Sequence, residues 1–267
     1  MDKKFIFNKC LSPIQRLSHS DIYPSISHLR QRKHKTVRLL VSTAACLIFV
    51  FLIGCVWAEV TVRSLDVTEK QLSIQSRVLE VATVAMEDGN FYQHTGIDWQ
   101  AVRRALEVNV RAGRIEQGGS TITQQLAKKL FLNDDRTAIR KVLEAFLAFA
   151  LERRFSKAQI LALYVHVIPY GMGQVGVENA SNFYFGKSSD RLTLGEAALL
   201  VSLVPRNPTA LPKPQSLQHG REVALQRIAF WFPGQFTDDA LEDALQERVS
   251  IRSKALQAQA PPLEYAH

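Results

Sequence analysis

Residues 87–96 read Glu87-Asp88-Gly89-Asn90-Phe91-Tyr92-Gln93-His94-Thr95-Gly96, and two further blocks complete the pattern that decides the fold of this 267-residue chain. The second block is Gly118-Gly119-Ser120-Thr121-Ile122-Thr123-Gln124-Gln125, and the third is Arg140-Lys141-Val142-Leu143-Glu144. The acidic blocks are separated by 57 residues, from Glu87 to Glu144. Carboxylates, a helix start and a run of cations therefore share one stretch of the chain.

The first block follows an apolar segment that predicts a largely buried helix over Leu72–Met86, stopped by Asp88-Gly89. Glu87 then lies at the helix exit, where the negative end of the helix dipole raises the pKa of a carboxyl group slightly. This favours Glu87 as a group that takes up a proton. Phe91 and His94 follow in a short loop and are expected to line a pocket beside the acid.

The second block predicts a bend followed by a capped helix, because Thr121 and Gln124 have the spacing of a capping box. Free N–H groups at such a helix start bind phosphates. Cations follow at Lys128, Arg136, Arg140 and Lys141. The spacing of Glu144 from Arg140 and Lys141 fits either weak surface pairs, worth a few tenths of a kcal/mol, or a carboxylate among cations that hold a diphosphate.

In this order, the three blocks resemble the signature motifs of the peptidoglycan glycosyltransferases, glycosyltransferase family 51. The resemblance covers roughly residues 75–215 and continues through Ser156–Tyr164, Tyr184–Lys187, Glu196–Ala198 and Pro205–Pro208. Two positions depart from the family pattern. Val165-His166 stands where members usually carry Leu-Asn, and Ala162 stands where many carry Glu.

The resemblance implies a mainly α fold, with a lysozyme-like helical lobe and a small membrane-proximal jaw drawn from roughly residues 109–140. The apolar residues expected on the surface of the jaw are Val110, Ile115, Leu130, Phe131 and Leu132. Further helix signals agree with this fold. Thr193 and Glu196 form another capping box, Gly186 ends the preceding helix, and prolines between 205 and 214 close the core.

The resemblance implies a glycosyltransferase, of hexosyltransferase type, that polymerises lipid II into β-1,4 glycan strands with inversion and releases undecaprenyl diphosphate. It carries over Glu87 as general base and Glu144 as the second catalytic carboxylate. The residues expected to bind diphosphate and sugar are Ser120, Gln124, Gln125, Lys128, Arg136, Arg140, Lys141 and His94. No metal site and no obligatory cofactor are expected, and a divalent cation such as Mg²⁺ or Mn²⁺ at the diphosphate is left open.

Outside these blocks, the net charge of +8 is concentrated in residues 1–38, which hold nine Lys or Arg and two Asp. The uncharged run of 20 residues from Leu39 to Ala58 follows directly, and about 30 Å of helix is enough to span a hydrocarbon core. The positive-inside rule then keeps residues 1–38 in the cytoplasm. We expect a single-pass protein of the bacterial cytoplasmic (inner) membrane, with its catalytic domain on the outer side.

Other interpretations of the N-terminus are a cleaved signal peptide and a lipoprotein box at Leu52-Ile53-Gly54-Cys55. The expected organisation continues with a juxtamembrane linker at 59–71, a glycosyltransferase core at 72–215 and a helical extension at 216–267, with a helix over Thr237–Leu256. The outer domain lacks cysteine, so its stability does not depend on disulfides. No second large domain follows within the 267 residues, so the monofunctional class is expected.

The expected partners are lipid II with the growing glycan, the membrane and other cell-wall synthesis proteins, without nucleic acid. Two rival functions stay open. The first is a lysozyme-like glycan-cleaving enzyme, which has no use for a cation set beside the acid. The second is a non-enzymatic protein, either an inactive scaffold of a wall-synthesis complex or a DNA-binding signal protein. The presence of Glu87 and Glu144 argues against an inactive scaffold. The basic tail lacks the helix-turn-helix pattern that a DNA-binding protein would need.

Overall fold

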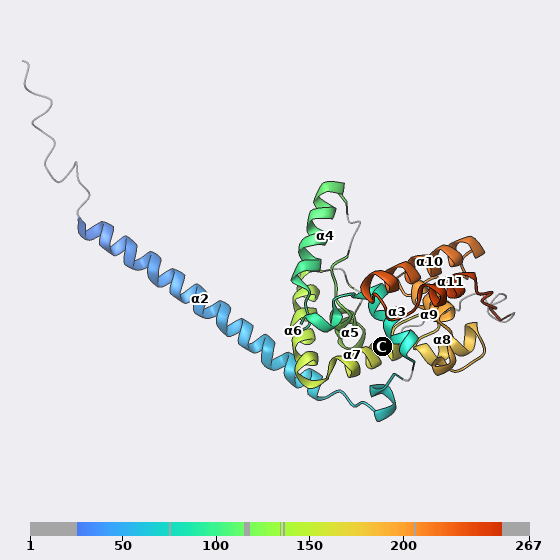
Figure 1. The fold of residues 1–267 in the computed structure, drawn as a ribbon. Coiled ribbons are helices and arrows are strands. Elements are labelled where there is room, and N and C mark those ends of the chain that lie inside the picture. Colours follow the sequence, from blue (N-terminus) through green and yellow to red (C-terminus); the bar gives the residue numbers. More distant parts are fainter. Residues whose placement is uncertain are drawn as a thin grey trace, which may run out of the picture. The chain divides into compact units, whose positions relative to one another are not determined.

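The structure, a computed structural model, describes residues 26–252 except 75, 115–117, 134, 136 and 206, and the side chains of 26–34 and 70 lie outside this description. The described chain is helical, with one isolated β-bridge and no named strand (Figure 1). Its elements are α2 (Ile26–Arg63), η2 (Glu69–Leu72), α3 (Arg77–Glu87), η3 (Phe91–Gln93), α4 (Trp99–Ala112), α5 (Ile122–Phe131), α6 (Ala138–Arg154), α7 (Lys157–Val167), α8 (Val177–Tyr184), η4 (Ser189–Arg191), α9 (Leu194–Leu203), α10 (Pro214–Trp231) and α11 (Asp238–Gln246). The predicted mainly α class is confirmed.

The long helix α2 contains the predicted membrane span. Its segment Lys35–Arg63 contains an 18-residue stretch with a mean hydropathy of 2.7, and by length and composition the segment can cross a membrane. The chain divides into two units, Met1–Gly54 and Cys55–His267. Within the second unit, Ala58 and Val62 are buried in the core cluster. The helix therefore continues to Arg63, through the start of the expected linker, because these two residues pack against the core.

Helix α3 begins at Arg77, five residues later than the sequence predicts. Ser76 is its N-cap and accepts a hydrogen bond from the Leu79 N–H, whereas Leu72 ends the short helix η2. The C-terminal end is as expected, because the Asp88 N–H donates to Val84 O at 2.9 Å and closes the last turn. Glu87 is thus the last residue of α3.

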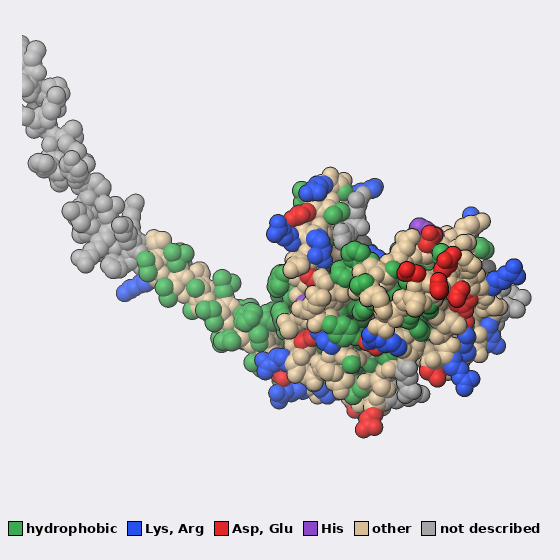
Figure 2. Space-filling model, in the orientation of Figure 1, with side chains coloured by type: hydrophobic (Ala, Val, Ile, Leu, Met, Phe, Trp, Pro, Cys, Tyr) green, Lys and Arg blue, Asp and Glu red, His purple; other side chains and the backbone are tan. Residues whose placement is uncertain are grey.

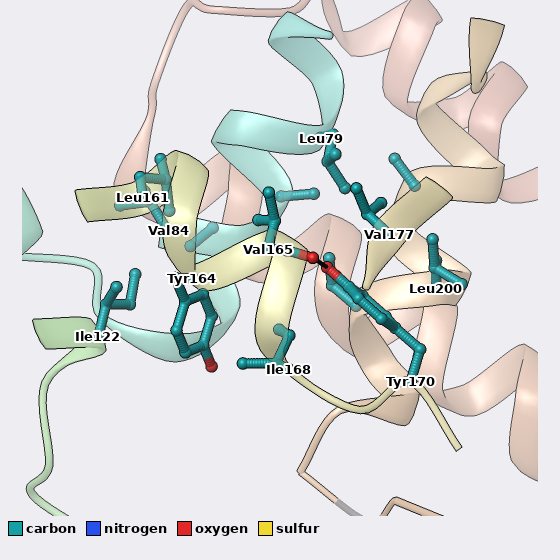
Figure 3. Packing of buried hydrophobic residues seen from close by; sticks show 14 of the residues in the cluster. Leu79, Val84, Ile122, Leu161, Tyr164, Val165, Ile168, Tyr170, Val177 and Leu200 are labelled. Atoms are coloured by element: carbon teal, nitrogen blue, oxygen red, sulfur yellow. Dashed lines mark hydrogen bonds between the residues drawn. The ribbon is translucent and has the colours of Figure 1, made fainter. Parts of the chain in front are cut away.

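One buried cluster forms the core, in which α5 packs on α6 and α7, and α3, α9 and α10 pack against one another. Helix α9 is buried along almost its whole length, and Tyr164, Tyr170 and Tyr184 are among the largest fully buried side chains. Figure 3 shows Tyr164 and Val165 of α7 among apolar side chains from several helices, and the Tyr170 hydroxyl donates to Val165 O. This packing fixes the two helices, α3 and α7, that flank the candidate site.

The first helix of the expected C-terminal extension packs against the core. Helix α10 packs on both α9 and α3, and its residues Ala224, Leu225 and Ile228 are buried. The helix predicted over Thr237–Leu256 is shorter, since α11 ends at Gln246 and residues 247–252 are not helical. Residues 253–256 lie outside the described residues. The capping box of Thr193 and Glu196 is confirmed.

The apolar surface expected on the jaw lies mostly on α4. Of the five predicted residues, Val110 is exposed, Leu130, Phe131 and Leu132 pack against the core, and Ile115 lies outside the described residues. Helix α4 instead exposes an apolar row formed by Trp99, Val102, Leu106 and Val110. Figure 2 shows Lys and Arg side chains beside hydrophobic ones on this helix. The difference arises because α5 turns its apolar face towards α6 and α7.

Candidate active site

The carboxylate of Glu87 is held from α5. The Gln125 side-chain amide donates to Glu87 Oε2 at 3.1 Å, and the Tyr164 hydroxyl from α7 donates to Gln125 Oε1 at 2.9 Å. Glu87 Oε1 is buried and has no hydrogen-bond partner. One carboxylate oxygen is therefore oriented by the protein, while the other can accept a hydrogen bond or a proton.

Burial raises the pKa of Glu87, against the hydrogen bonds from Gln125 and Tyr164 and the positive charge of Arg227, all of which lower it. The sequence predicts the same direction from the helix dipole, but desolvation is the larger cause. A carboxylate with a raised pKa is a stronger proton acceptor than an exposed one, so the environment suits general-base chemistry.

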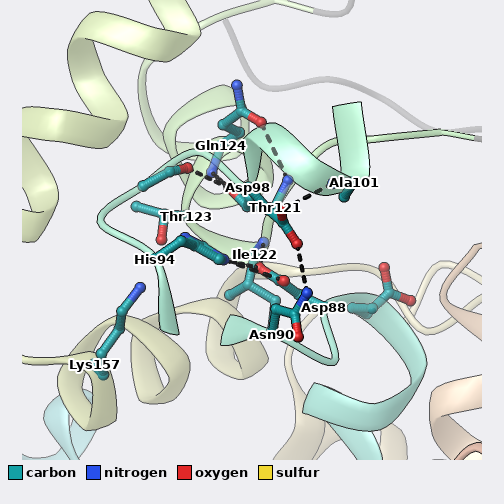
Figure 4. A network of polar contacts seen from close by, with 12 residues as sticks. Asp88, Asn90, His94, Asp98, Ala101, Thr121, Ile122, Thr123, Gln124 and Lys157 are labelled. Carbon is teal, nitrogen blue, oxygen red and sulfur yellow. Dashed lines mark hydrogen bonds and ion pairs between the residues drawn. The ribbon is translucent and has the colours of Figure 1, made fainter. Parts of the chain in front are cut away.

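His94 does not line an open pocket beside Glu87. Its Nε2 lies 3.0 Å from Asp88 Oδ2, and both side chains are almost fully buried. The same Asp88 oxygen accepts the Ile122 N–H at 3.0 Å, so Asp88 joins the first block to the first turn of α5 (Figure 4). The imidazole therefore orients Asp88, and Asp88 in turn positions the helix that carries Gln125.

The second block is locked to the first by its cap. Thr121 accepts from the Gln124 N–H at 3.2 Å, the Thr121 N–H donates to Gln124 Oε1 at 3.2 Å, and the Thr121 hydroxyl donates to Gly96 O at 2.6 Å. The predicted capping box is thus confirmed. Gln124 is buried and its amide oxygen is used in the cap, whereas Gln125, one residue later, faces Glu87.

Asp98 supports the same region from the start of α4 (Figure 4). Asn90 donates to its carboxylate at 2.9 Å and the Ala101 N–H donates at 2.8 Å. Burial raises the pKa of Asp98, but these hydrogen bonds and the Arg104 charge outweigh it and hold the pKa below its usual value. The loop 88–98 is therefore fixed at both ends by buried carboxyl groups, Asp88 and Asp98.

Glu144 lies in a buried charge cluster, not in exposed surface pairs. It is 1% exposed, and its two carboxylate oxygens bind Arg140 Nη1 and, at 2.6 Å, Lys141 Nζ. Lys141 Nζ also donates to Ser120 Oγ at 2.7 Å, which connects α6 to the second block. The interpretation of these contacts as weak surface pairs is wrong, because the Glu144 carboxylate is buried between its two cations.

The cations of this cluster repel one another. Burial lowers the pKa of Lys141, and the nearby charges of Arg140 and Lys128 lower it further. Such a concentration of positive charge favours a multivalent anion such as a diphosphate. Arg136, the remaining predicted cation, lies outside the described residues.

The described residues do not form a site that fits a protein-held divalent cation. No group of three or more His, Cys, Asp or Glu side chains in this part of the chain could hold a metal ion. The carboxylate nearest the expected diphosphate, Glu144, has both oxygens bound by cations. Side-chain cations therefore surround this carboxylate.

The family model described as transglycosylase matches residues 59–229. The chain belongs to the transglycosylase family. It is 45% identical over 175 residues to a penicillin-binding protein 1A of Aquifex aeolicus, an alignment that covers 65% of this chain and 24% of the relative. This transglycosylase chain is also similar to proteins named biosynthetic peptidoglycan transglycosylase. The one from Acinetobacter baylyi is 47% identical over 48% of this chain and 56% of the relative.

A biosynthetic peptidoglycan transglycosylase of Bordetella pertussis is 46% identical, with 50% of this chain and 56% of the relative covered. The transglycosylase chain thus spans between a quarter and just over half of the length of these relatives.

Several contacts of the site were not predicted from the sequence. The sequence assigns no role in the site to Tyr164 or Asp88, although both lie in motifs. Arg227 lies in no motif. Glu152 accepts from Thr123 at 2.6 Å and pairs with Lys157 at 2.8 Å. The place of Tyr164 at the end of the Ser156–Tyr164 stretch was the available signal for its contact with Gln125, while nothing in the local sequence around Arg227 indicates proximity to Glu87.

Proposed function

We propose that the chain is a peptidoglycan glycosyltransferase that polymerises lipid II into β-1,4 glycan strands and releases undecaprenyl diphosphate. The observation that carries the proposal is Glu87, a largely enclosed carboxylate with one oxygen bound by Gln125 and the other without a partner. The cations Arg140 and Lys141, the latter hydrogen-bonded to Ser120, supply the second requirement, neutralisation of a diphosphate.

In the proposed reaction, the 4-hydroxyl of the acceptor sugar attacks the anomeric carbon of the growing chain. Glu87 takes the hydroxyl proton, a new C–O bond forms on the face opposite the leaving group, and the bond to the diphosphate oxygen breaks. The electron pair leaves with undecaprenyl diphosphate, and the configuration inverts from α to β. Side-chain cations that stabilise the developing charge on the diphosphate lower the barrier to this step.

The cluster around Glu144 has a definite part in this scheme. Glu144 holds Arg140 and Lys141 in place through its two oxygens, and Lys128 adds positive charge from α5. Because a buried carboxylate balances the cations in the resting state, the cluster can form without a bound anion. The diphosphate then approaches the outward-facing N–H groups of these side chains.

We further propose that the enzyme works at a membrane surface, with α2 as its anchor and the basic N-terminal residues in the cytoplasm. The hydropathy of Lys35–Arg63 and the positive charge of residues 1–38 support this topology. The exposed apolar row of α4, flanked by Arg103 and Arg111, has the composition of a helix that lies at a lipid interface. Such a surface would bring the site to a lipid-linked substrate.

The test is polymerisation of labelled lipid II by the purified full chain in detergent or vesicles, with the product resolved on a gel and digested with lysozyme. We expect ladders of glycan that disappear on digestion and that the Glu87→Gln variant does not make. Release of soluble fragments from finished glycan, without polymerisation of lipid II, would assign the chain to glycan-cleaving enzymes instead. No turnover of either substrate would contradict an enzymatic function.

A further inference from the structure

Helix α10 contacts the chain on both sides of Glu87. The guanidinium of Arg227 donates to the carbonyl of Met86, the residue before Glu87. The indole of Trp231 lies over Gly89, two residues after Glu87, and a Cβ at position 89 would lie 2.6 Å from Trp231 Nε1 and closer still to two ring carbons. A side chain at position 89 would therefore displace the Trp231 indole.

The same C-terminal segment also contacts the beginning of α3. Arg77, the first residue of α3, donates to Gln235 Oε1 at 3.1 Å. Between these contacts α10 packs along α3, and Ile228 on its inner face is fully buried. Both ends of the helix that carries Glu87 are therefore fixed by residues 227–235.

The groups around the Glu87 carboxylate come from four elements. Gln125 of α5 and Tyr164 of α7 hydrogen-bond within the site, Asp88 adds negative charge from the adjoining turn, and Arg227 adds positive charge from α10. The negative charge of Glu87 also contributes to the raised pKa of Tyr170. Of the charged neighbours, Arg227 favours the ionised carboxylate and Asp88 opposes it, so α10 contributes charge as well as packing.

We propose that Arg227 and Trp231 are positioning residues for Glu87. They hold the turn Met86–Gly89 so that the free oxygen of Glu87 keeps its orientation towards the reacting hydroxyl, and Gly89 provides the space for the indole. This inference rests on the proposed function, because it assigns the two residues to the same general base. The residues touch the backbone on either side of Glu87 and act through it.

Trp231→Ala tests the packing contact. In the full chain with lipid II as substrate, we expect kcat to fall by about 10- to 100-fold, as for a small misplacement of a reacting group, with KM nearly unchanged. Phe230→Ala is the matched control, because Phe230 is the adjacent aromatic residue of α10, contacts Trp231 edge to face and is 73% exposed. Its kcat should stay at the wild-type value. Equal kcat in both variants and wild type would overturn the proposal.

Gly89→Ala tests the same contact from the other side and keeps the test decisive if one variant folds poorly. We expect Gly89→Ala to lower kcat, and Trp231→Ala to cost much less in the Gly89→Ala background than in the wild type, because both changes disrupt one contact. Fully additive effects of the two substitutions would show that they act separately and would contradict the pairing.

Arg227→Gln tests the charge without requiring turnover. Loss of the positive charge should raise the pKa of Glu87. The titration is followed by infrared or ¹³C NMR spectroscopy, and the Glu87 carboxyl signal is identified by its absence from the Glu87→Gln variant. Arg227→Lys keeps the charge and should return the pKa of Glu87 most of the way to its wild-type value. The acid limb of the kcat/KM profile should move to higher pH in the same variant. If wild type does not polymerise lipid II but Arg227→Gln shifts this titration, the proposed function fails and the contact stands. An unchanged titration would overturn the role of Arg227.

Discussion

Gln125 donates its side-chain amide to Oε2 of Glu87 at 3.1 Å, although the two residues lie 38 positions apart in the chain. This hydrogen bond connects the helix start of the second block to the acid of the first. Because it is made to the ionised carboxylate, it lowers the pKa that burial raises. The protonation state of Glu87 is therefore set jointly by α3 and α5.

Replacement of Glu87 by Gln should abolish proton uptake while the fold persists. We expect polymerisation of lipid II to fall by about 10²- to 10⁴-fold, as for a lost general base. Glu107→Gln on α4, which removes a surface pair with Arg103, is the control and should retain activity. Near-wild-type turnover of Glu87→Gln would show that another group takes the proton.

The same substitution should have a pH-dependent effect on stability. Because the folded state raises the pKa of Glu87 above its value of 4.5 in an unfolded chain, the folded state binds the proton more tightly. The stability of wild type relative to Glu87→Gln should therefore fall as the pH rises from 4.5 through the raised pKa, and stay lower above it. Chemical denaturation of both proteins at pH 4 and pH 8 measures this difference.

Gln125→Ala should move the acid limb of the kcat/KM profile to higher pH. The variant loses the donor that stabilises ionised Glu87, so the pKa of Glu87 rises further and a smaller fraction is deprotonated at a given pH. Gln124→Ala separates this effect from damage to α5, because Gln124 uses its side chain in the helix cap. The cap variant should lose stability, by about 1 kcal/mol, without moving the acid limb.

Arg140→Ala should destabilise the fold more than the loss of an exposed pair does, because Glu144 is buried and would keep only Lys141 as a partner. The loss should exceed the roughly 1 kcal/mol of an exposed pair and stay below the roughly 3–5 kcal/mol of a buried charge left unpaired. Arg103→Ala, which breaks the exposed i,i+4 pair with Glu107, is the matched control. Denaturant unfolding of the two variants should differ accordingly. A small and equal loss in the free energy of unfolding of both variants would mean that the Glu144 cluster is hydrated and open.

Truncation should reveal how far α2 belongs to the outer domain. A protein that begins at Cys55 keeps Ala58 and Val62, which are buried, and the Val62 and Leu65 carbonyls that accept from Arg154. A protein that begins at Leu65 loses both side chains and should be less stable by about 2 kcal/mol or more from the lost burial of Val62 alone. Thermal unfolding compares the two, and equal melting temperatures would place the core boundary after Arg63.

Chelation of divalent cations should leave measurable polymerisation. In the cluster around Glu144, Arg140 and Lys141 bind the two carboxylate oxygens and balance the negative charge. Lipid II turnover in EDTA, compared with turnover in added Mg²⁺ or Mn²⁺, measures the contribution of a cation bound with the substrate. Complete loss in EDTA, restored by metal, would mean that the side-chain cations alone do not neutralise the diphosphate.

Local signals in the sequence predicted much of the fold. The capping box of Thr121 and Gln124, the stop at Asp88 and the apolar span after Arg38 depend on residues a few positions apart, so their physics is present in the sequence itself. The start of α3 was misplaced because the apolar residues before Ser76 belong to η2 and a loop that pack on the core. An apolar pattern reports burial more reliably than helix boundaries.

The amino-acid sequence by itself determined the helical class, the candidate anchor and the two carboxylates, since each depends on composition or on short-range spacing. Only the tertiary structure decided that His94 holds Asp88, that Glu144 is buried between its cations and that Trp231 covers Gly89. These contacts join residues from loops and helices whose mutual orientation depends on how the whole core packs. Periodicity specifies which face of a helix is apolar, and the packed core alone specifies which partner meets that face.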